Sequence, residues 1–261
     1  MAIPADSRKG RLPLTCVLFD LDGTLIDTTT LIFESYRYTL NKMLGYIPTD
    51  EELLGQYGRP LVDAMRELVV GLGRSGGLKI EEAMETDQPA ATVSAQTPGQ
   101  VPSEEALVDR LVKAYRRYNA SQHDALIRPF PHVNETLAEL QRRGYVLGIV
   151  TSKGRAIAER SIAHYGLAAF METVITADDT PVHKPNPRPI LMALANVGKQ
   201  PQETLFVGDS VLDVQAGKAA GTLTAAAFWG PFAHEELLAQ HPDYTPLSML
   251  DLLAICPPRG S

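Results

Sequence analysis

The stretch that most constrains the fold is residues 17–24, where an apolar run ends in Asp20, Leu21, Asp22 and Gly23. A short run of Val, Leu and Phe is typical of a strand buried on both faces of a parallel sheet, and ligands bind beyond the carboxyl ends of such strands. Two carboxylates spaced by one residue repel each other unless a cation or a proton lies between them. Because Mg2+ prefers oxygen ligands, and because Gly23 lets its backbone N–H approach an anion closely, the stretch is a candidate site for a metal and a phosphate. Taken alone, it fits a strand followed by an Asp-Gly turn equally well.

Apolar runs alternate with helical patterns along the second half of the chain. The runs that we expect to be strands are residues 145–150, 173–175, 204–207 and 223–228. Repetition of strand and helix at this interval implies right-handed crossovers and a parallel sheet with helices on both faces. Between residues 28 and 127 no stretch has a convincing strand pattern, and the periodic segments there are helical. The sequence therefore predicts an α/β fold, a Rossmann-like parallel sheet with an all-helical cap inserted after the first strand.

The expected domain boundaries follow from this alternation. The parts are an α/β core, a helical cap and two tails, at residues 12–27 with 128–256, residues 28–127, and residues 1–11 and 257–261. Residues 73–102 contain glycines, prolines, an acidic cluster and a mixture of Ser, Thr, Ala and Gln. Such a composition buries little apolar surface, so we expect a surface insertion within the cap that is at most partly ordered.

Polar residues also follow the predicted strand at 145–150. Thr151, Ser152 and Lys153 come directly after it. We expect Ser152 to cap the next helix, as serine often does. That arrangement leaves the Thr151 hydroxyl and the first N–H groups of the helix for an anion above the sheet.

Lys184 and Asp209 lie at two further positions of this kind. Lys184 belongs to a His-Lys-Pro-Asn-Pro sequence, whose prolines stiffen the backbone, so this lysine can act as a fixed counter-charge rather than a solvated one. Asp209 follows the strand at 204–207, and Asp213 lies four residues later on the same face of the first helical turn. Such a pair is more often a helix cap. As the fourth polar strand end of one sheet, however, Asp209 is a candidate metal ligand.

In this order the four motifs resemble those of the haloacid dehalogenase superfamily, and four ordered motifs are a highly specific signal. They are the Asp-Leu-Asp-Gly-Thr sequence that begins at Asp20, then Thr151, then Lys184 with its following proline, and the Gly-Asp-Ser sequence around Asp209 with Asp213. The match covers nearly all of the α/β part, and the helical insertion is similar to the small helical cap of that superfamily. The insert at 73–102 departs from the usual cap.

The resemblance implies a catalytic or metal-binding role for four aspartates. Asp20 is the nucleophile and a Mg2+ ligand. Asp22 is the general acid/base, and its backbone carbonyl also meets the metal. Asp209 is the remaining protein ligand of Mg2+, and Asp213 supports it. At pH 7 a carboxylate is already ionised, so a nucleophilic aspartate needs no base to activate it.

The same resemblance implies that Thr151 and Lys184 hold the transferring phosphoryl group. Gly23 and Ser152 are further candidates for binding the phosphate. The obstacle for a nucleophilic carboxylate is that it attacks another anion. Mg2+ and Lys184 supply the compensating positive charge in a site closed to water.

The presence of Asp22 favours phosphoryl transfer over dehalogenation, the other reaction of the superfamily. It gives a proton to the leaving oxygen and then acts as base towards the water that hydrolyses the aspartyl phosphate. Dehalogenases of the superfamily lack this acid, because a halide leaves without a proton. The sequence therefore predicts a Mg2+-dependent phosphohydrolase acting on a small phosphorylated metabolite. Two alternatives stay open: a sugar-phosphate mutase similar to β-phosphoglucomutase, which shares the four motifs, and a catalytically silent phosphate-binding sensor, against which the intact acids argue.

Two stretches of the cap bear on the substrate. Residues 58–61, and residues 115–119 before His123, look like the branch that holds phosphoglycolate phosphatases and the inorganic pyrophosphatases related to them. Both substrates stay open on this basis. Arg59 is the candidate specificity residue: it either meets a distal anionic group, such as a carboxylate or second phosphate, or is a solvated arginine at a helix start.

Charge and cysteine usage limit the partners. The net charge of −7 argues against a nucleic-acid or anionic-membrane partner, because both favour basic surfaces. No protein partner is indicated. The two cysteines, Cys16 and Cys256, have no metal-like spacing and fit a reducing cytoplasm. We expect no cleavable signal peptide and no membrane-spanning segment.

Two other features receive no functional role. Residues 71–76 match the dinucleotide-binding glycine pattern, but they follow a helix rather than a strand, so the required context is missing. Trp229, the only tryptophan, follows the last predicted strand, and we expect it to pack against the edge of the sheet.

Overall fold

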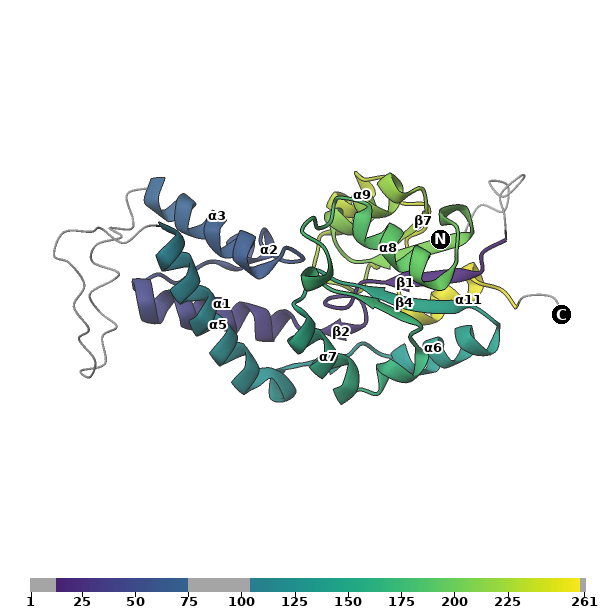
Figure 1. Ribbon diagram of the computed structural model, residues 1–261, viewed down its shortest axis with the longest axis horizontal. Helices are drawn as coiled ribbons and strands as arrows, with labels where there is room; N and C mark the ends of the chain where they lie inside the picture. Colours follow the sequence, from purple (N-terminus) through teal and green to yellow (C-terminus); the bar gives the residue numbers. More distant parts are fainter. Residues whose placement is uncertain (1–12, 75–103, 259–261) are drawn as a thin grey trace. The chain divides into compact units, whose positions relative to one another are not determined.

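The computed structural model describes residues 13–74 and 104–258. Its chain forms two compact units, Met1–Thr29 with Ile127–Ser261, and Thr30–Leu126 (Figure 1). We call the first unit the core and the second the cap. The insertion expected at 73–102 lies, from residue 75 onwards, outside the described residues, as do the first tail and most of the second.

A five-stranded parallel sheet organises the core. Its strands are β1 (Cys16–Phe19), β4 (Val146–Val150), β5 (Thr173–Ile175), β6 (Thr204–Gly208) and β7 (Leu223–Ala226). They lie in the order β5-β4-β1-β6-β7, and every neighbouring pair is parallel. All four residues of β1 are fully buried, as its uninterrupted apolar sequence predicts for the central strand. The predicted α/β fold is confirmed.

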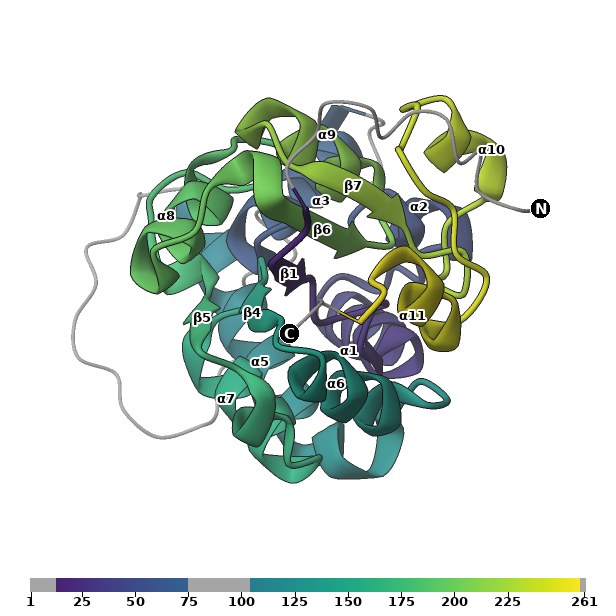
Figure 2. The same ribbon diagram turned by 90° about the vertical axis from the view of Figure 1, so that its right-hand side faces the viewer.

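Helices cover both faces of this sheet. They are α6 (Val133–Arg142), α7 (Arg155–His164), α8 (Arg188–Val197), α9 (Val211–Ala220), α10 (His234–Leu238) and α11 (Leu252–Ile255). Figure 2 shows α8 and α9 on one face and α6, α7 and α11 on the other. One apolar cluster joins β1 and β6 to α8 and α9 through residues such as Leu18, Phe206, Ile190 and Ala216. Because all five strands run the same way, their carboxyl ends share one edge of the sheet.

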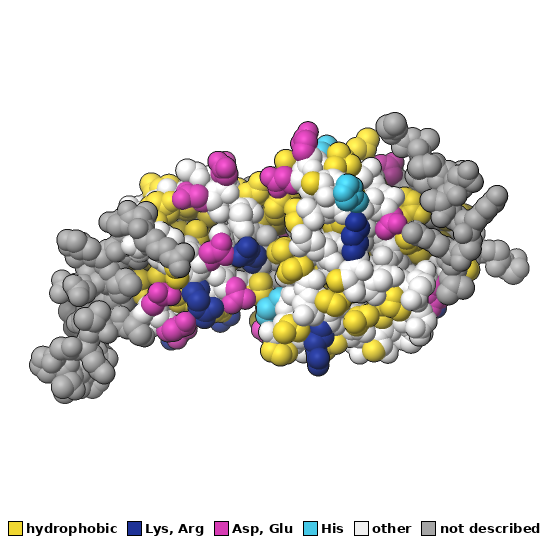
Figure 3. Space-filling model, turned by 90° about the horizontal axis from the view of Figure 1, so that it is seen from above, with side chains coloured by type: hydrophobic (Ala, Val, Ile, Leu, Met, Phe, Trp, Pro, Cys, Tyr) yellow, Lys and Arg dark blue, Asp and Glu magenta, His cyan; other side chains and the backbone are white. Residues whose placement is uncertain are grey.

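The cap is a small helical unit with its own apolar core. Its helices are α1 (Thr29–Leu44), α2 (Asp50–Leu54), α3 (Leu61–Arg74) and α5 (Glu104–Leu126). Apolar residues at helical spacing, among them Leu40, Met65 and Leu111, are fully buried in one cluster. Thr49 and Glu52 form the capping box that begins α2. Figure 3 shows basic and acidic side chains interspersed on the visible face of these helices.

A second, very small sheet lies in the core where the chain leaves for the cap and returns from it. β2 (Ile26–Asp27) pairs antiparallel with β3 (Arg128–Pro129). The Tyr165 hydroxyl donates a hydrogen bond to the Ile127 carbonyl at 2.6 Å and so fixes the returning strand. The sequence did not predict this pair, because strands of two residues show no periodicity.

Among the described residues, every helix is too short or too polar to cross a membrane.

Candidate active site

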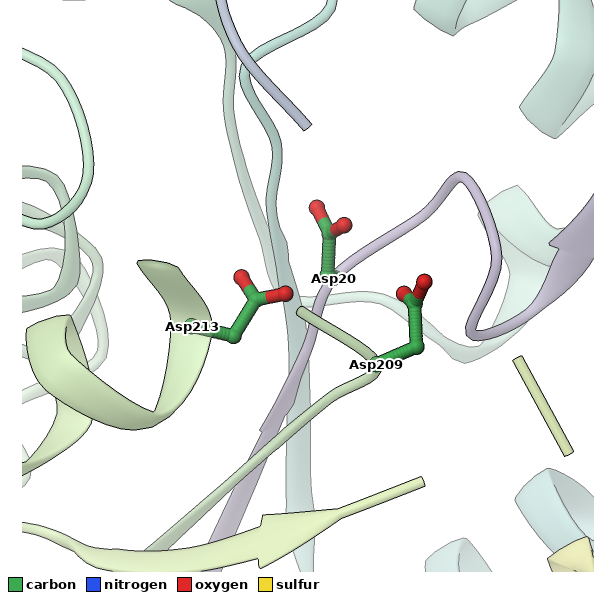
Figure 4. Close-up of side chains that lie close together, drawn as sticks. All are labelled: Asp20, Asp209 and Asp213. Carbon is green, nitrogen blue, oxygen red and sulfur yellow. The ribbon is translucent and has the colours of Figure 1, made fainter. Parts of the chain in front are cut away.

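Three buried carboxylates gather where two neighbouring strands end. Asp20 follows β1 directly, Asp209 follows β6, and Asp213 lies in the first turn of α9 (Figure 4). β1 and β6 are paired in the sheet, which brings their ends together. One carboxylate oxygen from each of the three residues lies within 4.8 Å of the other two. Asp209 precedes the N-cap residue Ser210, so it lies at the strand–helix junction rather than in the helical turn that we expected.

Lys184 lies among these carboxylates. Its Nζ is 2.8 Å from Oδ1 of Asp20 and 2.6 Å from Oδ1 of Asp213, and it is buried. Burial alone would lower the pKa of Lys184, but the charges of Asp20 and Asp213 outweigh it and raise the pKa above its ordinary value. The lysine is therefore charged throughout the physiological range.

One lysine does not balance three carboxylates. Burial raises the pKa of Asp20 to about 7, and the nearby charge of Lys184 offsets only part of that effect. Burial, followed by the charges of Asp213 and Asp20, raises the pKa of Asp209 well above its ordinary value. The site thus holds more negative charge than its own lysine neutralises, and a further cation would be attracted to it.

The oxygen atoms show where such a cation fits. Oδ2 of Asp209 is buried and has no hydrogen-bond partner among the described residues. Oδ1 of Asp20 also receives no hydrogen bond, because Lys184 approaches it outside hydrogen-bonding geometry. Asp213 differs: Lys184 donates to its Oδ1, and the Ser210 backbone N–H and hydroxyl donate to its Oδ2. Asp20 and Asp209 therefore fit the hard oxygen-ligand set of Mg2+, whereas Asp213 holds Lys184 and the helix start in place.

Gly23 lies against Asp209. Its φ is +81°, and a Cβ built on it would lie 2.2 Å from Oδ2 of Asp209. Both the left-handed backbone and the close approach require glycine here. The loop after β1 thereby packs directly against the candidate metal ligand.

Asp22 is held apart from the three buried carboxylates. Its Oδ1 accepts a hydrogen bond from Lys153 Nζ at 2.7 Å, in a pair that is nearly buried. We expected no role for Lys153 from the sequence. Its position two residues after Thr151, in a loop at the same sheet edge, could have indicated one.

The loop after β4 corrects one expectation. Ser152 does not cap α7: the N-cap is Gly154, and the Arg155 N–H is capped instead by Asp178 Oδ2 at 2.8 Å. The Ser152 hydroxyl is buried without a hydrogen-bond partner among the residues described. Thr151 is also buried, and its hydroxyl oxygen accepts from the Lys153 N–H at 3.2 Å. The reason for the error is that the loop runs two residues further before the helix begins, so an acceptor from another loop reaches the first N–H.

Arg59 lies in the cap, at the turn before α3. It forms an ion pair with Glu67, and its side chain is 38% exposed. The pair is local to the cap surface.

A family comparison covers both units. The model of the haloacid dehalogenase-like hydrolase family matches residues 17–227, which run from β1 to just beyond β7. The chain belongs to this family. Both the predicted family and its hydrolase character are thus confirmed.

Individual proteins of the haloacid dehalogenase-like family are similar over nearly the whole chain. Pyrophosphatase PpaX of Bacillus velezensis is 37% identical over 242 residues, which cover 93% of this chain and 96% of the relative. PpaX of Bacillus pumilus is likewise 37% identical over 242 residues. A solved structure from Lactobacillus plantarum, provisionally named a phosphoglycolate phosphatase, is 27% identical with a TM-score of 0.71 and covers 94% of this chain and 100% of its own.

Proposed function

We propose that this hydrolase is a Mg2+-dependent phosphohydrolase that acts on a small phosphorylated metabolite through an aspartyl-phosphate intermediate. The observation that carries the proposal is the placement of Asp20. Its carboxylate lies buried at the end of β1, 2.8 Å from the Lys184 ammonium and in one cluster with the carboxylate of Asp209, whose Oδ2 has no partner among the described residues. Mg2+ held by Asp20, Asp209 and the Asp22 backbone carbonyl would polarise the phosphoryl oxygens and offset the repulsion between two anions.

The residues of the core then divide the reaction between them. A carboxylate oxygen of Asp20 forms a bond to phosphorus while the bond to the leaving oxygen breaks, and Asp22 gives that oxygen a proton. Water next attacks the aspartyl phosphate and loses its proton to Asp22, which releases phosphate and restores Asp20. Lys184 supplies fixed positive charge, and Asp213 keeps Lys184 in place through the 2.6 Å hydrogen bond.

Small groups around Asp20 complete the phosphate site. The Thr151 and Ser152 hydroxyls and the Gly23 N–H are the proposed donors to the phosphoryl oxygens. The Ser152 hydroxyl, buried without a partner among the described residues, supports this role, because a buried hydroxyl is costly to leave unbonded.

Pyrophosphate is the first substrate to test and phosphoglycolate the second. The curated relatives that share 37% of their residues with this chain are named as pyrophosphatases, which supports that order. Both substrates carry a negative group on the side of the leaving oxygen, a second phosphate or a carboxylate, and Arg59 of the cap is the proposed contact for that group.

We also propose a cytoplasmic location. Cys16 and Cys256 are buried and form no disulfide bond, which fits a reducing compartment.

The decisive experiment is an assay of phosphate release from pyrophosphate, phosphoglycolate, a set of sugar phosphates and a generic aryl phosphate, each with and without Mg2+. We expect release that depends on Mg2+ and falls by at least ~1000-fold in Asp20→Asn, which keeps the shape of the side chain but removes the nucleophile. Asp109→Asn, at an exposed position of α5 in the cap, is the control.

Other results of this assay would contradict the proposal or replace it. Release without Mg2+, or equal release by Asp20→Asn, would overturn the phosphohydrolase proposal. Transfer of phosphate between sugar phosphates, activated by a bis-phosphate and without net release, would replace it with a mutase.

A further inference from the structure

Trp229 makes a contact that packing at the sheet edge does not explain. It follows β7 and is half-buried, and its indole Nε1–H donates a hydrogen bond to the backbone carbonyl of Thr24 at 2.9 Å. This bond joins two loops whose residues are 205 positions apart in the chain. A purely apolar contact with the sheet would need the ring but not the N–H.

Thr24 carries the connection on to the candidate metal ligand. It is fully buried, and its hydroxyl donates to Oδ1 of Asp209 at 2.7 Å. That bond occupies one oxygen of Asp209, and the other, Oδ2, is the buried atom that lacks a partner among the described residues. The carboxylate of Asp209 is thus oriented so that only one oxygen is available to a cation.

Gly230 gives a second, independent indication. A Cβ built on Gly230 would lie 2.3 Å from the Cβ of Asp209, a separation that real atoms do not adopt. Unlike Gly23, Gly230 does not have a positive φ, so its backbone conformation does not require glycine. What requires glycine is the closeness of Asp209. The loop after β7 therefore packs as closely against Asp209 as the loop that contains Gly23.

We propose that Trp229 and Gly230 are positioning residues for the metal site. Trp229 fixes the Thr24 backbone, Thr24 fixes Oδ1 of Asp209, and Gly230 gives the Asp209 side chain room to turn Oδ2 towards the ion. This inference rests on the proposed role of Asp209 as a Mg2+ ligand. Groups that orient a metal ligand in this way change metal affinity by about 10–100-fold when they are removed.

The test measures binding of the metal alone, with Mn2+ as an EPR-visible replacement for Mg2+. In Trp229→Phe, which keeps an aromatic ring but loses the N–H, we expect the Kd for Mn2+ to rise by about 10–100-fold. Phe228→Leu is the matched control. Phe228 is the neighbouring aromatic residue and stacks on His234, so this change should leave the Kd unchanged. An unchanged Kd in Trp229→Phe would overturn the inference.

Asp209→Asn separates this inference from the proposed function. If Asp209→Asn abolishes Mn2+ binding while Trp229→Phe leaves it intact, only the positioning role is wrong. If Asp209→Asn also leaves binding intact, the proposed metal site is wrong, and the positioning role fails with it.

Two further measurements distinguish positioning from loss of folded protein. In Trp229→Phe, the Mg2+ concentration for half-maximal activity should rise by about 10–100-fold, while kcat at saturating Mg2+ recovers to within about 3-fold. A lower kcat with no change in the Mg2+ requirement would overturn the inference. In a Thr24→Val background, Trp229→Phe should have little further effect on the Kd, because both substitutions act through the hydrogen bond from the Thr24 hydroxyl to Asp209. If the two effects are additive instead, Trp229 does not act through Thr24. Gly230→Ala should also raise the Kd if the variant folds.

Discussion

Lys184 in the core and Arg66 in the cap each contact two carboxylates. Lys184 lies 2.8 Å from Asp20 and 2.6 Å from Asp213, and its side chain is 2% exposed. Arg66 lies 3.1 Å from Asp63 and 3.0 Å from Glu105, and its side chain is 38% exposed. The distances between the charges are similar in the two groups, but Lys184 is buried and Arg66 is exposed.

The difference in burial determines what happens when one charge of each group is lost. Around Arg66, water solvates every member, so each charge can be lost without leaving another uncompensated. Around Lys184, burial removes that alternative, and the carboxylates Asp20 and Asp209 respond with raised pKa values. A folded protein holds uncompensated charge in its interior only where something else, such as a metal or a substrate, completes the balance.

Removal of the buried cation should have the largest effect. Lys184→Met leaves Asp20 and Asp213 buried without their cation, and breaking such a pair destabilises a protein by about 3–5 kcal/mol. We expect that loss in urea unfolding at pH 8 without metal, together with loss of activity. Lys113→Met, which removes an exposed lysine of the cap, is the control. Unfolding curves that coincide for the two variants would show that the buried Lys184 contributes no more to stability than an exposed lysine.

Removal of Lys153 should have an intermediate effect, on the reaction rather than on the fold. Lys153→Met frees the Asp22 carboxylate from its 2.7 Å contact, so the proposed acid is less well placed. We expect kcat/KM for a substrate that needs a proton on its leaving oxygen to fall by about 10–100-fold, and the value for an aryl phosphate with an acidic leaving group to fall less. Lys153→Arg should restore part of the difference. Equal losses for both substrates would argue against a role through Asp22.

Mg2+ should stabilise the protein more as pH rises. The pKa of Asp20 is 3.8 unfolded and about 7 in the metal-free fold. Between those values the folded state binds more protons, so the contribution of Asp20 to stability is full at low pH and is lost as pH rises through the folded pKa. Mg2+ replaces the proton and removes that loss.

Thermal unfolding at several pH values tests this linkage. The increase of Tm at one fixed Mg2+ concentration should be near zero at pH 5, where protons compete with the ion, and reach several degrees at pH 8. Asp20→Asn should make the increase smaller and less dependent on pH, and Asp209, whose pKa is also raised, should supply the dependence that remains. A Mg2+ effect that is larger at pH 5 would contradict the assignment of Asp20 as a buried carboxylate that loses its proton to bind metal.

Removal of Arg66, the exposed cation of the cap, should have the smallest effect on stability. Arg66→Ala removes contacts to Asp63 and Glu105, both on the surface, and we expect Tm to change by no more than ~1–2 °C at moderate salt. Scanning calorimetry measures this, and high salt should remove what difference remains. A drop as large as that of Lys184→Met would mean that the cap, too, depends on a charge network.

The sheet and the closeness of its polar strand ends could be predicted from the sequence because they follow from strand periodicity. Asp20 and Asp209 each come directly after an apolar run, and parallel strands place such residues at one edge. The loops could not be predicted in the same way. Lys153 meets Asp22, and Trp229 meets Thr24, through contacts between segments that are 131 and 205 residues apart. The expected Ser152 cap failed for the same reason, because Asp178 from a separate loop supplied the acceptor.

The pairing of β2 with β3 determines how the cap of this enzyme could be removed or replaced. Residues 27 and 128 face each other in the antiparallel pair, so the core's two connections to its insert are anchored next to each other. A linker of a few residues could therefore join them directly, and every strand of the large sheet would keep its register. Different helical inserts could therefore replace the cap between these two anchor residues without any change to the sheet that carries the carboxylates.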